Sequence, residues 1–244
     1  MDILIYPDWP QPKTAMACST TRIGGDSLPP YDSFNLGLHV GDQTRLVEQN
    51  RSSLMKIAQL PTQPYWLNQV HGTHIIDLSN EKNGNRQADA AYSSERGQVC
   101  VVMTADCLPV LLCNQQGTEI AAVHAGWRGL CDGILEKAIK QFKSPGSSIM
   151  AWLGPAISAE KFEVGSEVRD AFIKHDAELA QGFKAYDNGK YLADLYLLAR
   201  LKLNAVGVKN IYGGTYCTVS EPTRFFSYRR DGVTGRMASL IWLK

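Results

Sequence analysis

A cysteine and a histidine stand at opposite ends of a segment that has the pattern of a β-hairpin. In residues 104–129, TADCLPVLLCNQQGTEIAAVHAGWRG, two β-favouring runs are separated by the polar turn NQQG. The expected register pairs Cys113 with Thr118. It sets Cys107 opposite His124, with Cβ atoms roughly 4.5–5.5 Å apart on one face, whereas a shift of one residue would separate them. A facing thiol and imidazole can act as an activated nucleophile, as metal ligands or as an inert buried pair.

One more histidine extends this pair to a three-ligand set. His71, in WLNQVHG, would join Cys107 and His124 in a thiolate and imidazole set that leaves the fourth zinc position open, as catalytic zinc sites do. The gaps of 36 and 17 residues between these three ligands match no compact metal motif, so the hypothesis rests on the residue types alone. His124 also opens HAGWRG, a small-residue turn into a helix, where amide groups and Arg128 would attract an anion.

The elements that must position these residues form a mixed pattern without regular βαβ alternation. We predict an α/β fold of the mixed α+β class, with residues 1–244 as a single domain in which mixed sheets and helices form a sandwich. The predicted helices are 44–59, 130–142, 166–175 and 192–206, and the predicted strands are 99–103, 108–113, 118–123, 149–153 and 208–212. A second hairpin is predicted from strands 224–228 and 237–243 around RRDGVTG.

The composition limits the classes of partner and compartment. The 25 Lys and Arg nearly cancel the 24 Asp and Glu, and the net charge of +1 argues against a nucleic-acid or membrane-surface binder. No apolar stretch is long enough to span a membrane, and the N-terminal segment lacks the pattern of a signal peptide. The six cysteines form no CxxC pair, so we expect a cytoplasmic protein in which the five cysteines other than Cys107 are buried free thiols.

Nine short motifs along the chain resemble the signatures of the bacterial YfiH-like, laccase-domain family. They are TRIGG (21–25), FNLGLHVGD (34–42), NQVHG (68–72), ADA (88–90), TADCLPVLL (104–112), AAVHAGWRG (121–129), LGPAI (153–157), FEVG (162–165) and FFSYRRDGVTGR (225–236). The resemblance implies a fold related to the catalytic domain of the cytotoxic necrotizing factor toxins, which use a cysteine and a histidine to deamidate. It also implies that His71, Cys107 and His124 are zinc ligands.

Members of this family are described as purine nucleoside phosphorylases with adenosine deaminase activity, formerly called polyphenol oxidases. The resemblance therefore implies a zinc-dependent enzyme that cleaves adenosine, inosine, guanosine or methylthioadenosine with phosphate, and that also deaminates adenosine. A purine nucleoside and phosphate are the expected partners, and the oligomeric state is left open. For deamination, zinc would lower the pKa of its water toward about 7 for attack on C6 of adenine, and His39 or Asp106 would move the proton.

Phosphorolysis requires cations for phosphate and hydrogen-bonding groups for the nucleoside. The candidate phosphate ligands are Arg22 in the TRIGG motif, and Arg229 and Arg230 in the predicted hairpin. Asn35 and Gln69 are candidates to bind the ribose or the base.

Two alternative enzyme classes and one binding module remain open. The family's description in peptidoglycan editing and the toxin resemblance suggest a cysteine- or zinc-dependent amide hydrolase that acts on peptidoglycan precursors. Copper-dependent polyphenol oxidase activity, an oxidoreductase reaction, is the second alternative. Five histidines are too few for a multicopper laccase, but Cu²⁺ can occupy a His/Cys site because its intrinsic affinity exceeds that of Zn²⁺. The third alternative is a protein module that binds a metal or a partner and catalyses no reaction.

Overall fold

Strands and helices follow one another irregularly along the chain, which gives the mixed α+β class expected from the sequence. The computed structural model describes residues 2–81 and 84–244. Its strands are β1 (Leu4–Ile5), β2 (Ala15–Thr20), β3 (Ile75–Asp77), β4 (Ala90–Ser93), β5 (Val99–Thr104), β6 (Leu108–Asn114), β7 (Ile120–Ala125), β8 (Ile149–Leu153), β9 (Glu163–Val164), β10 (Phe183–Ala185), β11 (Tyr191–Ala193), β12 (Asn210–Gly213) and β13 (Met237–Leu243). Its α-helices are α1 (Thr44–Ile57), α2 (Trp127–Cys131), α3 (Ile134–Ile139), α4 (Ser166–His175), α5 (Leu195–Ala205) and α6 (Tyr228–Asp231).

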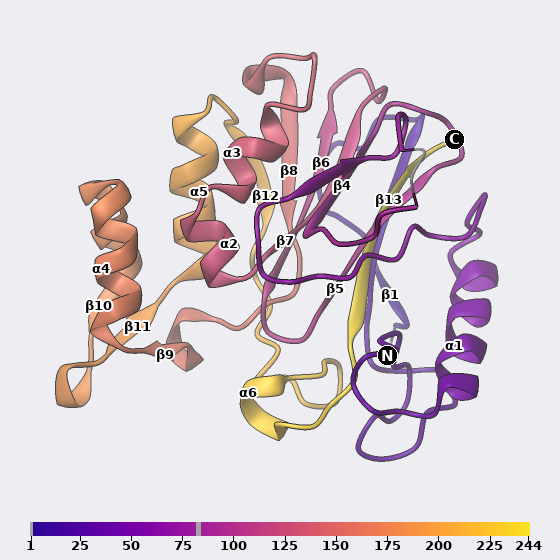
Figure 1. The fold of residues 1–244 in the computed structure, drawn as a ribbon, viewed down its shortest axis with the longest axis horizontal. Coiled ribbons are helices and arrows are strands. Elements are labelled where there is room, and N and C mark those ends of the chain that lie inside the picture. The colour runs from indigo at the N-terminus through magenta and orange to yellow at the C-terminus, as the bar shows by residue number, and fades with distance from the viewer. Residues whose placement is uncertain (1, 82–83) are drawn as a thin grey trace.

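Two sheets pack face to face at the centre of the fold. The larger sheet has the strand order β12-β8-β6-β7-β4-β3 and is mixed, because β3 and β4 pair in parallel and so do β8 and β12. The smaller sheet has four antiparallel strands in the order β1-β2-β13-β5. Figure 1 shows α2, α3 and α5 on the outer side of the larger sheet, and α1 beyond the smaller sheet. The third sheet, β10-β11-β9, lies farther out, beside α4.

Three apolar cores hold these layers together. Alternate residues of β6 serve different cores, since Leu108 and Val110 pack with the helices whereas Leu111 packs with the smaller sheet. The third core joins α1 to the smaller sheet through residues such as Leu54 and Leu240. Strands β5, β6 and β7 are buried along their whole length because both of their faces are covered.

Most predicted elements are present, but one predicted helix and one predicted hairpin are wrong. Residues 166–175 and 149–153 have the predicted bounds. The single helix predicted over 130–142 is two helices, because Gly133 has φ +89° and interrupts the helix between α2 and α3. The hairpin predicted from 224–228 is absent because both edges of β13 are already paired, with β2 and β5. Residues 228–231 form the short helix α6 instead.

The predicted register of the first hairpin is wrong by two positions. Cys113 pairs with Ile120 rather than with Thr118, and His124 faces Pro109. Because side chains alternate with a period of two, a shift of two residues leaves each side chain on its predicted face. Cys107, which immediately precedes β6, therefore still approaches His124.

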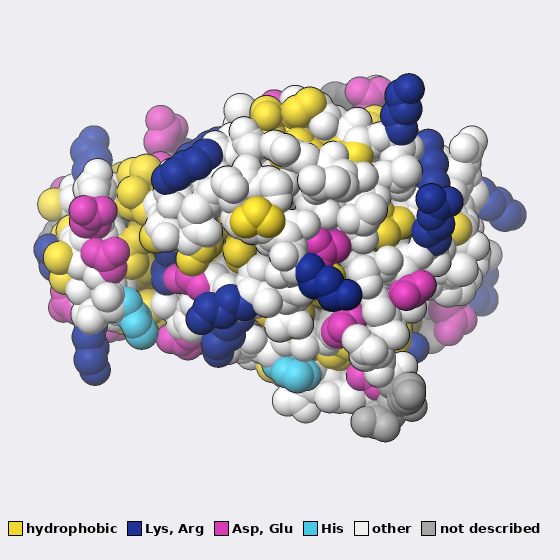
Figure 2. Space-filling model, turned by 90° about the horizontal axis from the view of Figure 1, so that it is seen from above, with side chains coloured by type: hydrophobic (Ala, Val, Ile, Leu, Met, Phe, Trp, Pro, Cys, Tyr) yellow, Lys and Arg dark blue, Asp and Glu magenta, His cyan; other side chains and the backbone are white. Residues whose placement is uncertain are grey.

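The surface carries both charge signs. On the face shown in Figure 2, basic and acidic side chains are interspersed, in agreement with the small net charge. Within residues 2–81 and 84–244, no helix combines the length and apolar character needed to cross a bilayer. Among the cysteines expected to be buried, Cys217 is partly exposed, and the other four are buried.

Candidate metal centre and active-site pocket

The three predicted metal ligands meet at one end of the larger sheet. His71 lies in the loop before β3, Cys107 immediately precedes β6, and His124 is in β7. Their ligand atoms all lie within 4.8 Å of one another. Cys107 Sγ is 3.9 Å from His71 Nε2, and the two imidazole rings make an edge contact with centroids 4.9 Å apart. The structure thus brings together side chains that are 36 and 17 residues apart in the sequence.

Asp89 holds the two histidines in place. Its carboxylate is fully buried and accepts a hydrogen bond from His124 Nδ1 at 2.8 Å. It also accepts the backbone N–H groups of Val70, His71 and Gly72 at 3.2, 2.9 and 2.7 Å. The bond to Nδ1 leaves His124 Nε2 to face Cys107, as in metal sites where a carboxylate orients the ligand histidine. In the sequence Asp89 is visible only as the centre of the ADA motif, where a charged residue flanked by alanines at the start of a strand is the signal for this role.

An unusual backbone conformation presents Cys107 to the pocket. Asp106 has φ +91°, a conformation that costs free energy for a residue with a Cβ. Its carboxylate accepts hydrogen bonds from the Thr218 hydroxyl and the Arg229 backbone N–H, both at 2.6 Å. Asp106 is buried and does not line the pocket, so the structure places it as a support of the turn rather than beside the reacting groups.

The site favours a thiolate beside an imidazolium in the absence of metal. Burial would raise the pKa of Cys107, but the hydrogen bonds and positive charge of His124 and His71 outweigh it and lower the pKa to about 6. Burial would lower the pKa of His124, but the bonds to Asp89 and Cys107 raise it to about 9. The pKa of Asp89 lies below its ordinary value because the bond from His124 and the backbone N–H groups outweigh its burial.

A cavity of about 400 Å³ opens in front of these ligands. This volume lies in the range of small-molecule sites. Its polar side chains are His39, Gln69, His71, Thr104, Cys107, His124, Tyr228 and Arg236, with Met103 and Ala105 as apolar neighbours.

Arg236 is the cation of this pocket, and sequence reasoning did not select it. Its Nη1 donates to the carbonyl oxygens of Thr234 and Gly235, and among the described residues no acceptor bonds to its other N–H groups. Gly37 allows its close approach, because a Cβ there would lie 2.9 Å from Arg236 Cγ and 3.4 Å from His39 Cε1. The pocket therefore offers a guanidinium together with the candidate metal ligands.

His39 lines the same pocket, and its surroundings favour the neutral ring. Desolvation lowers the pKa of its ring, and the charges of Arg236 and Arg51 lower it further. A neutral imidazole has one nitrogen that accepts a proton and one that donates. This predicted residue is thus placed where it can move a proton.

Two other predicted substrate contacts have their polar groups engaged by the protein. The Gln69 amide donates to Met103 O and accepts from Met103 N–H, although the residue lines the pocket. Asn35 is fully buried and accepts from the backbone N–H groups of Gly37 and Arg236, so it joins the two loops that carry His39 and Arg236.

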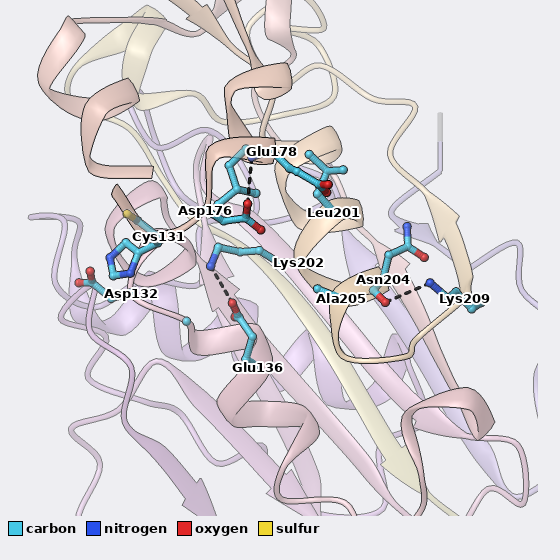
Figure 3. A pocket seen from close by; sticks show the side chains of 13 residues that line it. Cys131, Asp132, Glu136, Asp176, Glu178, Leu201, Lys202, Asn204, Ala205 and Lys209 are labelled. Carbon is cyan, nitrogen blue, oxygen red and sulfur yellow. Dashed lines mark hydrogen bonds and ion pairs between the residues drawn. The ribbon is translucent and has the colours of Figure 1, made fainter. Parts of the chain in front are cut away.

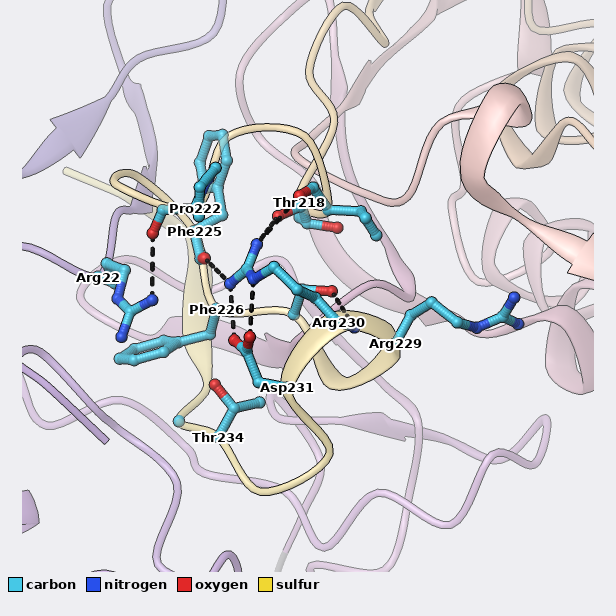
Figure 4. A network of polar contacts seen from close by, with 12 residues as sticks. Arg22, Thr218, Pro222, Phe225, Phe226, Arg229, Arg230, Asp231 and Thr234 are labelled. Atoms are coloured by element: carbon cyan, nitrogen blue, oxygen red, sulfur yellow. Dashed lines mark hydrogen bonds and ion pairs between the residues drawn. The ribbon is translucent and has the colours of Figure 1, made fainter. Parts of the chain in front are cut away.

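The four predicted arginines do not line this pocket. Arg22 donates to Pro222 O and lies over Phe226, whereas Arg230 donates to Thr218 O and Phe225 O (Figure 4). The side chain of Arg229 donates to the carbonyl of Glu163. Arg128 lies against the ring of its neighbour Trp127 at the surface.

The ligand atoms suit a zinc ion. One thiolate and two imidazoles are preferred zinc donors, and three protein ligands would leave the fourth coordination position without a protein ligand. Gly126 keeps the centre open, because a Cβ there would lie 3.0 Å from His71 Cδ2 and 3.2 Å from Cys107 Sγ. The residues present therefore fit the metal that the sequence implies.

Comparison with known proteins places the whole chain among close relatives. Residues 16–244 match the family described as multi-copper polyphenol oxidoreductase laccase. The chain is 57% identical over 243 residues to a protein of Escherichia coli named purine nucleoside phosphorylase YfiH, with 100% of both chains covered. It is 50% identical to a purine nucleoside phosphorylase of Haemophilus influenzae, with 98% and 99% covered. A crystal structure of a Neisseria meningitidis protein superposes with a TM-score of 0.96 at 50% identity, and YlmD of Geobacillus stearothermophilus superposes with 0.88 at 30%, each over 100% of both chains.

Proposed function

Because the chain belongs to the family described as multi-copper polyphenol oxidoreductase laccase, and its close relatives are named purine nucleoside phosphorylases, we propose that it is a metal-dependent purine nucleoside phosphorylase. The observation that carries the proposal is the pocket that Arg236 and His39 share with the cluster of His71, Cys107 and His124. Adenosine, inosine, guanosine and methylthioadenosine are the proposed substrates. Deamination of adenosine is proposed as a second reaction at the same site.

The chain's own groups divide the work between binding and proton transfer. His71, Cys107 and His124 would hold Zn²⁺, which when bound would supply Lewis-acid chemistry to the reaction. Arg236 binds the phosphate through the N–H groups that no described residue accepts. A phosphate oxygen then bonds to C1′ as the bond from C1′ to the purine nitrogen breaks, and the pair of electrons in that bond leaves with the base. His39, whose pKa is lowered so that the neutral ring is favoured, can pass the proton of the phosphate to the leaving base.

The proposal predicts phosphate-dependent cleavage of inosine by the zinc-loaded protein. Hypoxanthine and ribose 1-phosphate should appear together in equal amounts, and neither should appear when phosphate is omitted. Product analysis by chromatography measures both. Zinc-loaded protein that releases no hypoxanthine from inosine in the presence of phosphate would overturn the proposal.

Replacing Arg236 with methionine should weaken phosphate binding. A charge-assisted hydrogen-bonded contact contributes about 2 kcal/mol, so we expect the KM for phosphate to rise roughly 30-fold while the KM for inosine changes little. Methionine retains much of the aliphatic volume beside Gly37. Arg45→Met is the matched control, because Arg45 is exposed on α1 and bonds only to Gln49 among the described residues. Equal phosphate KM values in the two variants would contradict the role of Arg236.

A second candidate function is supported by Asp89, which bonds to His124 Nδ1, and by the Cys107 thiol, whose sulfur lies within 4.8 Å of the ligand nitrogen of His124. A thiolate with an oriented imidazole is the arrangement of a cysteine nucleophile, so we also consider an amide hydrolase that acts on peptidoglycan precursors. In this mechanism the thiolate bonds to the amide carbonyl carbon and His124 protonates the leaving amine.

Copper can bind to the same three ligands, since Cu²⁺ binds such sites more tightly than Zn²⁺.

Alkylation of metal-free protein separates the two functions. The pKa of Cys107 is lowered, so the thiolate is present above pH 6 and is lost as the pH falls through that value. We expect its reaction with iodoacetamide to reach half its maximal rate near pH 6, and zinc to suppress the reaction. Cys18 and Cys113 are internal controls, because burial raises the pKa of both thiols. Alkylation of Cys107 at equal rates with and without zinc would favour the amide hydrolase.

A further inference from the structure

A second cavity, of about 540 Å³, lies among the outer helices (Figure 3) and shares no lining residue with the pocket described above. The last residue of α2, Cys131, opens into it, together with the adjoining Asp132. His175, the last residue of α4, lines it as well. The description of the family and the names of the relatives mention no site among these helices.

These three side chains have the types and spacing of a metal site. The Cys131 sulfur, one Asp132 oxygen and one His175 nitrogen all lie within 4.8 Å of one another. With zinc bonds of about 2.0–2.3 Å in tetrahedral geometry, ligand atoms lie about 3.3–3.7 Å apart. Closing the remaining distance takes only side-chain movement, and Asp132 and His175 are exposed and free to make it. We propose that Cys131, Asp132 and His175 form a second metal site, for a zinc-like divalent cation.

The charges around the cavity favour a cation. Glu136 accepts a hydrogen bond from Lys202 at 2.6 Å through Oε1, whereas its Oε2 is buried and has no hydrogen-bond partner among the described residues. Four carboxylates line the cavity against two ammonium groups, so the formal charge is negative. They are Asp132, Glu136, Asp176 and Glu178, against Lys202 and Lys209.

The position of this site assigns it a structural role. Helix α2 begins at Trp127, three residues after His124, and ends at Cys131. An ion held by Cys131 and His175 would tie the end of α2 to the end of α4. The beginning of α2 follows the strand that carries His124, so the second ion would stabilise a helix that adjoins the first site without contacting the substrate.

Metal analysis in a background without the first site tests this proposal. Cys107→Ser removes a ligand of the first cluster, and the zinc content is measured after removal of free metal. We expect one equivalent in C107S, none in C107S/H175A, and one in the control C107S/H74A. His175 is the residue to replace because it is exposed, and His74 is an exposed histidine outside both clusters. Cobalt loaded into C107S should show a thiolate-to-cobalt charge-transfer band, and this band should be absent from the double variant C107S/C131S.

Each outcome bears on the second site independently of the proposed activity. Zinc absent from C107S, or zinc retained in C107S/H175A, would overturn the second site. Cobalt bound without the thiolate band would overturn it as well, since the ion would then lie on other groups. The first site is judged separately, by the zinc content and phosphorolysis of H175A, in which the three ligands near the pocket are intact.

Discussion

Replacing Cys107 with alanine is expected to abolish phosphorolysis, with a fall in kcat/KM of more than about 100-fold. Loss of a group that only supports a metal ligand costs 10–100-fold, and Cys107 is itself one of the three ligands. Two imidazoles without the thiolate should no longer retain zinc after removal of free metal, so the zinc content should fall by one equivalent relative to the unmodified protein. The measurement is the initial rate of hypoxanthine release from inosine, together with the zinc content of the same sample.

The fold should survive this substitution. Cys107 is partly exposed and precedes β6, so its sulfur contributes little to the cores. Cys217→Ala is the matched control, because Cys217 is also partly exposed and belongs to neither ligand cluster. An unchanged melting temperature with lost activity would identify a role in the reaction. Normal turnover by Cys107→Ala would contradict a metal centre at this position.

Asp89→Asn is expected to have the second largest effect, on both metal affinity and stability. The asparagine amide group would face backbone N–H groups that now donate to a carboxylate oxygen, and His124 would lose its charged partner. We expect a 10–100-fold loss of zinc affinity, as for other carboxylates that orient a ligand histidine. Because a buried charge pair is broken, we also expect the free energy of unfolding to fall by about 3 kcal/mol.

Zinc titration and urea denaturation measure these two effects. Asp194→Asn is the matched control, since Asp194 caps α5 by accepting the Leu197 N–H, a role that asparagine performs equally well. A drop in stability without a change in zinc affinity would limit Asp89 to a structural role. Equal zinc affinities and equal free energies of unfolding for Asp89→Asn and Asp194→Asn would contradict any special role of the Asp89 carboxylate.

The sequence predicts the candidate metal ligands even with a wrong register, because side chains alternate between the two faces of a strand. The register was shifted by two residues, which leaves Cys107 and His124 on the same face. The predicted phosphate contacts of the two hairpin arginines depended on the predicted hairpin and failed with it. Arg229 and Arg230 were assigned to a strand that cannot form, because β13 is paired on both edges, and the helix α6 directs them to other partners. Arg236 enters the pocket instead, in a loop joined to Asn35.

By itself the sequence determined which chemistry is available: a thiol and two imidazoles in family motifs, a mixed α+β pattern and a chain without a basic excess. Those properties are local, so residue types and the short repeat of apolar residues along the chain are enough to predict them. Only the tertiary structure decided that Asp89 orients His124, that Arg236 is the cation of the pocket, and that Cys131 meets His175 from 44 residues away. These contacts join elements remote in sequence, and their geometry depends on how sheets and helices pack, which no local pattern contains.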